Sequence, residues 1–225
     1  MNFPYYCNVS NTLTSPSATR TRILKRALVR YNKHGVAAVS SAHLATALGM
    51  SQGNLAYHFP RKADLVLALF AEREGRIAAL FEQLRTDYLR QRDQPFGALV
   101  IHLGELFGIV WAYRFVSIDL GFLARKFPEI ASAWQRENET MAQLTEALFR
   151  LAVTDGHVEP EPELGAFAAA IHRMQVLLNF SVADAAARQL DAAPYAHFLL
   201  EDLRNLCTPQ GRALLPTHMP VPVLR

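Results

Sequence analysis

Residues 39–62, VSSAHLATALGMSQGNLAYHFPRK, constrain the fold of this chain more than any other stretch. Ser40 or Ser41 can cap a first short helix, because a serine oxygen accepts the unpaired N–H groups of the first turn. Gly49 follows the apolar face of that helix and can adopt the left-handed conformation that ends it. Ser51 can then cap a second helix. Two short helices joined by a glycine turn predict a helix-turn-helix, whose second helix enters the major groove of DNA.

The charge distribution also points to DNA. Residues 1–63 contain eight lysines and arginines and no acidic residue, and Asp64 is the first carboxylate. The remaining residues contain 15 basic and 20 acidic ones. A basic segment joined to an acidic body is expected when the basic part binds phosphates. From charge alone, a solvated basic helix face remains the alternative interpretation.

The same region resembles the TetR family of bacterial transcriptional regulators. The run SQGNLAYHFPRK at 51–62 is close to the family pattern S-x-G-x-L-Y-x-H-F-x-x-K, and residues 19–75 fit the family closely. Position 56 is usually aromatic in the family but is Ala56 here, and Tyr57 can take over part of that role. The resemblance implies an all-α homodimeric repressor with an N-terminal three-helix helix-turn-helix domain. It also implies a larger C-terminal helical domain for effector binding and dimerisation.

The expected DNA-binding residues lie on the two short helices and just after them. Amide side chains early in the second helix can pair with the edges of adenine, and the resemblance implies phosphate contacts further along. The residues expected to contact DNA are Ser40, Ser41, His43, Ser51, Gln52, Gly53, Asn54, Tyr57, His58 and Lys62. For His58, a half-buried packing role is the alternative. Leu55 and Phe59 are expected to hold the second helix to the core.

The rest of the chain predicts an all-helical protein. Apolar residues recur at helical spacing over 19–33, 63–88, 96–112, 114–126, 128–154, 163–190 and 193–207. We divide the chain into a flexible arm (1–18), the helix-turn-helix domain (19–62), the effector-binding and dimerisation domain (63–208) and a tail (209–225). The tail is expected to trail over the surface.

The segment 96–124 is apolar enough for a membrane span to be considered. Glu105, Arg114 and Asp119 interrupt it, so no uncharged stretch of about 18 residues remains. We therefore expect two buried helices and no membrane partner. The N-terminal residues lack the features of a signal peptide, and the two cysteines form no metal-binding spacing. A cytoplasmic protein without metal or cofactor is the simplest expectation.

The same segment supplies the candidate effector site. The residues expected to contact a small apolar or amphipathic effector are His102, Glu105, Phe107, Trp111, Arg114, Phe115 and Asp119. Aromatic residues at helical spacing are more often plain core, and a structural ion pair of Arg114 with Glu105 or Asp119 is the competing interpretation. An open pocket here would favour effector binding.

The last two long helices predict the dimer interface, because each has an apolar side that a second copy can cover. The first contributes Leu164, Phe167, Ala168, Ile171, Met174, Gln175 and Leu178, and the second Tyr195, Phe198, Leu199, Leu203 and Leu206.

No hydrolase, metalloprotease or nucleotide-binding motif is present, so no catalytic residue is expected. A helical enzyme and an architectural DNA-binding protein without a ligand are the alternatives. An architectural protein would have a C-terminal domain that is solid to its centre.

Overall fold

The computed structural model describes residues 18–90, 95–190 and 193–219. Residues 1–17 of the proposed arm (1–18) therefore lie outside the described residues. The described residues form α1 (Ala18–Ala38), α2 (Ser41–Leu48), α3 (Gln52–His58), α4 (Lys62–Arg90), α5 (Pro95–Ala112), α6 (Phe115–Lys126), α7 (Pro128–Thr154), α8 (Ala166–Arg188), α9 (Ala193–Leu206) and α10 (Pro209–Leu214). The predicted all-α class is confirmed. Within the described ranges the only β feature is an isolated bridge between Val158 and Cys207.

Local capping residues and glycines set the ends of the N-terminal helices. The side chain of Ser40 accepts a hydrogen bond from the backbone N–H of His43 at 3.1 Å, and Ser51 caps α3 in the same way. Gly49 ends α2 with a φ of +66°, a value that glycine adopts without steric cost. A second positive φ, of +76° at Gly35, interrupts α1. The predicted glycine turn and serine caps are confirmed.

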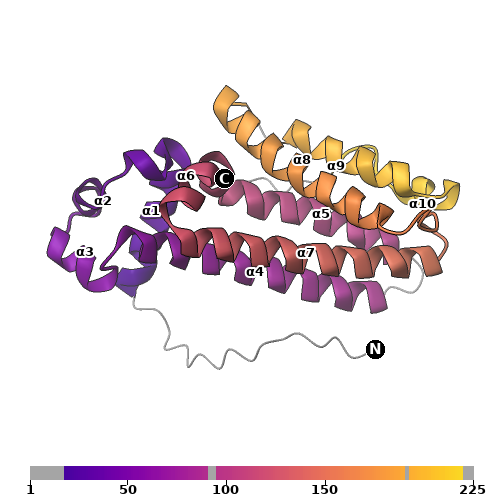
Figure 1. Ribbon diagram of the computed structural model, residues 1–225, viewed down its shortest axis with the longest axis horizontal. Coiled ribbons are helices and arrows are strands. Elements are labelled where there is room, and N and C mark those ends of the chain that lie inside the picture. The colour runs from indigo at the N-terminus through magenta and orange to yellow at the C-terminus, as the bar shows by residue number, and fades with distance from the viewer. Residues whose placement is uncertain (1–17, 91–94, 191–192, 220–225) are drawn as a thin grey trace.

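The molecule is elongated, with α1, α2 and α3 gathered at one end (Figure 1). Helices α4 and α7 lie side by side and run in the same direction, away from that end (Figure 1). Helix α5 packs along α4, and α8 and α9 pack against each other on the far side of α5 (Figure 1). The end formed by α1, α2 and α3 is connected to the rest of the molecule mainly through the packing of α1 against α6 and α4.

Two separate hydrophobic cores hold these helices. The N-terminal core joins α1, α2 and α3 to the beginnings of α4 and α7 and to α6, through residues that include Ile23, Tyr31, Leu55, Leu69, Phe115 and Ile130. The C-terminal core joins α5, α8 and α9 to the later parts of α4 and α7, through residues that include Ile77, Leu84, Phe107, Leu148, Phe167 and Leu203. Helices α4 and α7 are each long enough to contribute to both cores.

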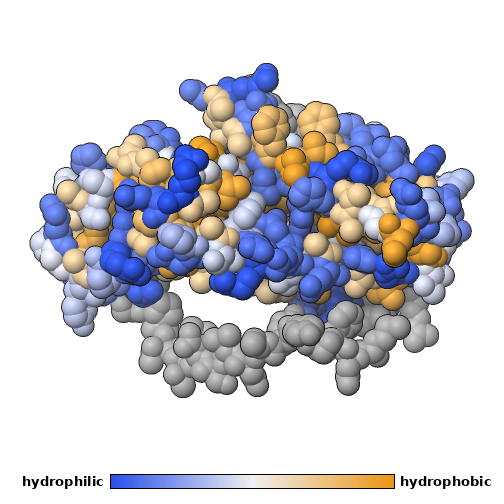
Figure 2. Space-filling view, viewed as in Figure 1, coloured by the Kyte–Doolittle hydropathy of each residue, from blue (hydrophilic) through white to orange (hydrophobic). Residues whose placement is uncertain are grey.

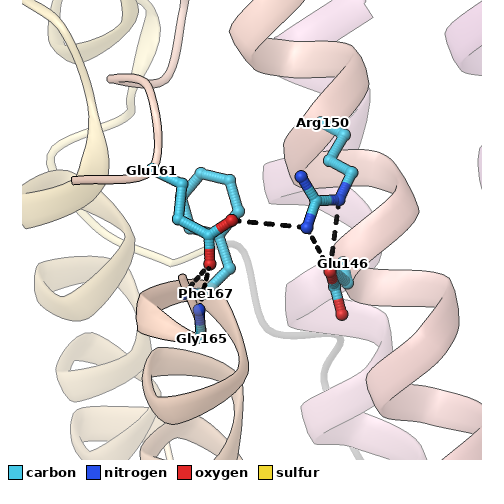
Figure 3. Close-up of polar contacts among 5 residues, drawn as sticks. All are labelled: Glu146, Arg150, Glu161, Gly165 and Phe167. Carbon is cyan, nitrogen blue, oxygen red and sulfur yellow. Dashed lines mark hydrogen bonds and ion pairs between the residues drawn. The ribbon is translucent and has the colours of Figure 1, made fainter. Parts of the chain in front are cut away.

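The loop between α7 and α8 is anchored by Glu161, so α8 begins at Ala166 and not at 163 as predicted. The Glu161 carboxylate accepts hydrogen bonds from the N–H groups of Gly165 and Phe167 at 3.0 and 3.1 Å (Figure 3). Arg150 pairs with the same carboxylate at 3.3 Å. The hydrogen bond from Phe167 N–H is the main reason why the pKa of Glu161 lies below its usual range. The N–H groups at the start of α8 are thus satisfied by a charged cap.

The expectation of a trailing tail after residue 208 is wrong for its first part. Thr208 caps α10 by accepting a hydrogen bond from the Gly211 N–H at 3.0 Å, and its hydroxyl donates to the Gly156 carbonyl at 2.8 Å. Gly211 packs so closely that a Cβ there would lie 1.9 Å from the His157 carbonyl oxygen. The absence of a side chain at this position lets α10 pack against the α7–α8 loop.

No single helix of the described part of the chain is both long and apolar enough to cross a membrane. Helices α5 and α6 meet the length and composition test only as a pair bent by 58°.

Candidate nucleic-acid interface and effector cavity

The exposed surface of α3 is polar and has no packing role. Gln52, Gly53, Asn54 and Tyr57 are all exposed, and the Tyr57 side chain is 83% exposed. Ser40, Ser41 and His43 are exposed at the start of neighbouring α2, and exposed Ser51 caps α3. All the residues expected to contact DNA thus lie around the end formed by α2 and α3, beside the start of α4 (Figure 1). A large exposed tyrosine among amide side chains is typical of a surface that meets another molecule.

The opposite side of α3 is fixed to the N-terminal core. Leu55 and Phe59 are buried, as predicted. Arg20 of α1 donates a hydrogen bond to the His58 carbonyl at 3.1 Å, and its guanidinium lies 4.2 Å from the centre of the Phe59 ring. His58 is half-buried, and its ring meets that of Tyr57 edge to face. The recognition helix is therefore held rigidly from behind while its polar side stays open.

Lys62 lies where α4 begins and is half-buried. Its ammonium group donates a hydrogen bond to the carbonyl oxygen of Val36, and burial lowers the pKa of Lys62. The Val36 N–H in turn donates to the carboxylate of Asp119 on α6. Lys62 therefore connects α4 to the end of α1, and two of its three N–H donors remain for a phosphate.

Helix α1 is also attached to the break between α5 and α6. The amide of Asn32 donates to the Ala112 carbonyl at 2.8 Å and accepts from the Phe115 N–H at 3.0 Å. One amide side chain thus satisfies both backbone groups that the break exposes. This contact and the one from Asp119 fix the helix-turn-helix to α6 as well as to α4.

The C-terminal domain encloses a narrow apolar cavity. It is lined by Leu80, Phe81 and Leu84 of α4, Leu99, His102, Leu103 and Leu106 of α5, Thr145, Leu148 and Phe149 of α7, and Met174 of α8. The enclosed space is about 30 Å³, close to the volume that one water molecule takes up in the liquid. His102 is buried and lies 3.6 Å from the Asp87 carboxylate. In this conformation the cavity is too small for an effector molecule.

The structure does not gather the seven residues expected at the effector site. Only His102 lines the cavity, and Glu105 borders a separate open groove between α4 and α5. Phe107 and Phe115 are fully buried in different cores. Trp111 packs against the C-terminal core, and the Arg114 guanidinium lies over its ring. Asp119 accepts a hydrogen bond from the Val36 N–H. Arg114 and Asp119 form no ion pair with each other or with Glu105. In place of the expected open pocket along 102–119, the structure has a small cavity between the later parts of α4 and α7.

The expected dimer face is corrected for most of its α8 residues, whereas Phe198, which was expected on the same face from α9, is exposed. Phe167, Ile171, Met174 and Leu178 of α8 are buried inside the subunit, because they cover α5 and α7. The apolar side chains exposed on the outer face of α8 are Val176 and Phe180, at 52% and 67%, and Phe198 on α9 is 51% exposed. Figure 2 shows hydrophobic atoms interspersed with hydrophilic ones along the upper edge, where Figure 1 places α8 and α9.

Taken together, a capped helix-turn-helix, an exposed polar recognition helix and a separate helical domain define a two-domain DNA-binding protein. The comparisons with known proteins agree. Residues 23–69 match the model of bacterial regulatory proteins of the tetR family, and residues 81–207 match that of a bacterial transcriptional repressor of the same family. The chain belongs to the TetR family of DNA-binding transcriptional regulators, whose members are regulators and not enzymes.

Similar proteins support this assignment. The transcriptional regulator UidR of Escherichia coli K12 is 23% identical over 153 residues, which cover 68% of this chain and 76% of UidR. Salmonella enterica GusR is 25% identical, with a TM-score of 0.61 over 87% of this chain and 98% of GusR. A TetR-family regulator from Marinobacter aquaeolei VT8 has the same fold, with a TM-score of 0.74 at 22% identity over 87% of this chain and 94% of that protein.

Proposed function

We propose that this protein acts as a homodimeric repressor that binds an inverted-repeat operator and releases it when a small apolar or amphipathic molecule binds. The observation that carries this proposal is the rigidly supported recognition helix whose amide and phenol side chains are all exposed. A two-fold dimer presents two such helices, so it recognises two half-sites about one turn of DNA, or somewhat more, apart.

Base recognition and phosphate binding are assigned to different residues of this surface. Gln52→Ala and Asn54→Ala should each change the preferred half-site, at a cost of about 1–3 kcal/mol for a lost bidentate contact. Lys62→Ala should instead weaken binding to every sequence and reduce the salt dependence by about one phosphate contact. Fluorescence anisotropy against a panel of half-site variants, at several salt concentrations, measures both effects.

Lys126→Ala is the control, because it removes the same charge from an exposed lysine at the end of α6, outside the residues assigned to DNA contact. Its salt dependence should stay near that of the native protein. A changed operator preference in Lys62→Ala, with unchanged preference in Gln52→Ala and Asn54→Ala, would show that the roles are reversed.

For dimerisation, the outer faces of α8 and α9 are the best candidate surface. Val176, Phe180 and Phe198 expose large apolar side chains on adjacent helices, and two copies of one patch form a closed two-fold interface. A second copy can cover these side chains and remove them from water. We assign the dimer interface to these residues and not to the buried side of α8.

For the effector, the cavity between α4, α5, α7 and α8 is the best candidate. Its lining is apolar except for His102 and Thr145, which suits a mostly apolar molecule with one hydrogen-bonding group. Because the cavity holds only about one water molecule, an effector has to separate α4 from α5 and α7. Helix α4 starts beside the recognition helix, so this movement lowers operator affinity, and DNA lowers effector affinity by the same factor.

Filling the cavity should abolish the response to the effector. Thr145→Leu adds volume to a space that is already narrow, so the compound that releases the native protein should act at least about tenfold more weakly. The assay is release of labelled operator, with the compound found by screening a metabolite library against the native protein. Thr154→Leu is the control, since Thr154 is exposed on the same helix and its hydroxyl also bonds the carbonyl four residues earlier. Equal responses of the native protein and both variants to the compound would show that it does not bind in this cavity.

A further inference from the structure

A buried ion pair lies where the two hydrophobic cores meet. On α4, Phe70 belongs to the N-terminal core and Ile77 to the C-terminal core, and Arg73 lies between them. On α7, Glu137 lies in the same way between Ala133 and Met141, which belong to the two different cores. The Arg73 guanidinium donates to the Glu137 carboxylate, and the two side chains are 2% and 4% exposed. This pair therefore joins α4 to α7 at the junction between the cores.

The surroundings fix the pair in one arrangement. The Arg73 guanidinium lies 5.8 Å from the centre of the Phe70 ring and 5.4 Å from that of Trp134. Burial raises the pKa of the Glu137 carboxyl, and the neighbouring guanidinium opposes this shift. The Nε of Arg73 and Oε2 of Glu137 have no hydrogen-bond partner in the structure. A buried pair that is only partly satisfied contributes little net stability, and in some proteins such a pair fixes the register of the elements that it joins.

Contacts link this pair to both functional surfaces. On the dimer side, Gln175 of α8 donates to the carbonyl of Asn138, the residue after Glu137, at 2.8 Å. Gln175 immediately precedes Val176 of the proposed dimer face. On the DNA side, α4 runs from Arg73 back to Lys62 at the base of the recognition helix. The path from the dimer face to the DNA surface thus passes through α7, the ion pair and α4.

A small change of the α4 angle at the ion pair displaces the first residue of α4, beside the recognition helix, by a large distance. Arg73 lies 11 residues after Lys62, which corresponds to about 16 Å of helix. A tilt of α4 by about 10° around this point moves its first residue by about 3 Å. That shift is close to the rise of about 3.4 Å per base pair of DNA.

We infer that Arg73 and Glu137 are positioning residues for DNA recognition, which fix the angle of α4 against α7 and thereby the spacing between half-sites that the dimer accepts. The inference rests on the proposed dimeric binding of an inverted repeat. Replacing both residues by apolar ones of similar size keeps the packing but removes the directional bond. The dimer then tolerates half-sites that are too close or too far apart.

The test compares the native protein with the Arg73→Met/Glu137→Leu double variant on operators whose central spacer is shortened or lengthened by one base pair. The operator is the one that the native protein selects from random DNA. The native protein should lose affinity at least about tenfold for each spacer change, a cost comparable to that of a mismatched base pair. The double variant should lose less than about threefold while still unfolding cooperatively.

The matched control is Glu82→Leu/Arg85→Met, which removes an exposed ion pair from the same helix and should keep the native spacing profile. If the first double variant does not fold, Glu137→Gln serves instead, because it keeps the shape and should also broaden the profile. If affinity falls equally steeply with spacer change in the native protein and in the folded double variant, this inference is overturned and the inverted-repeat proposal is not. A native protein with no spacing preference overturns the inverted-repeat proposal and this inference with it.

Discussion

Phe180→Glu should convert the dimer into a monomer and lower operator affinity by a factor on the order of 10²–10⁴, because each half-site is then bound independently. The Phe180 side chain is 67% exposed on the outer face of α8, one turn after exposed Val176. In a two-fold interface the new carboxylate of each copy meets an apolar surface, and burying an unpaired charge there is costly. Sedimentation at micromolar concentration and operator titration measure the two effects.

Ile101→Glu is the control for this change. Ile101 is 53% exposed on α5, so the same charge is introduced at a similarly exposed apolar residue outside the proposed interface. This variant should remain dimeric and bind the operator normally. Dimers of Phe180→Glu with native operator affinity would move the interface away from the outer face of α8.

Glu137→Ala should lower the free energy of unfolding by about 3–5 kcal/mol, because it leaves the buried guanidinium of Arg73 without a compensating charge. The comparison is Glu82→Ala, which breaks the exposed pair with Arg85 and should cost less than about 1 kcal/mol. Urea denaturation followed by circular dichroism measures both values. A loss below 1 kcal/mol for Glu137→Ala would show that the Arg73 side chain reaches solvent.

The DNA-binding end could be predicted from the sequence almost residue by residue. Its helices are short and are delimited by local signals, the caps at Ser40 and Ser51 and the left-handed Gly49. Such signals act within a few residues, so they need no knowledge of the tertiary fold. The exposed side of α3 followed directly, because Leu55 and Phe59 leave only one side for the core.

The cavity proposed for the effector could not be predicted from the sequence, because α5 is apolar on nearly all sides. Periodicity does not select one face of such a helix, and the break after Ala112 directs Phe107 and Phe115 into different cores. The cavity residues Leu80, Phe81 and Leu84 of α4 recur at helical spacing, so the sequence does not distinguish them from ordinary core positions. Helix α8 is likewise apolar on two sides, so its inward side was mistaken for the dimer face.

The sequence contains one signal for the buried ion pair. Arg73 occupies a position within the apolar stripe of α4, four residues after Leu69 and four before Ile77. A charged residue at such a position is buried only when it is paired. Its partner, 64 residues later on α7, could not be identified before the packing of the two helices was known.

The most direct test of the proposed function is selection of binding sites from random DNA, followed by measurement of the mass of the selected complex. The proposed function predicts an inverted repeat bound by two copies of the chain, with half-site centres about one helical turn, or somewhat more, apart. A single asymmetric half-site bound by one copy, or binding without sequence preference, would contradict a dimeric operator-binding regulator.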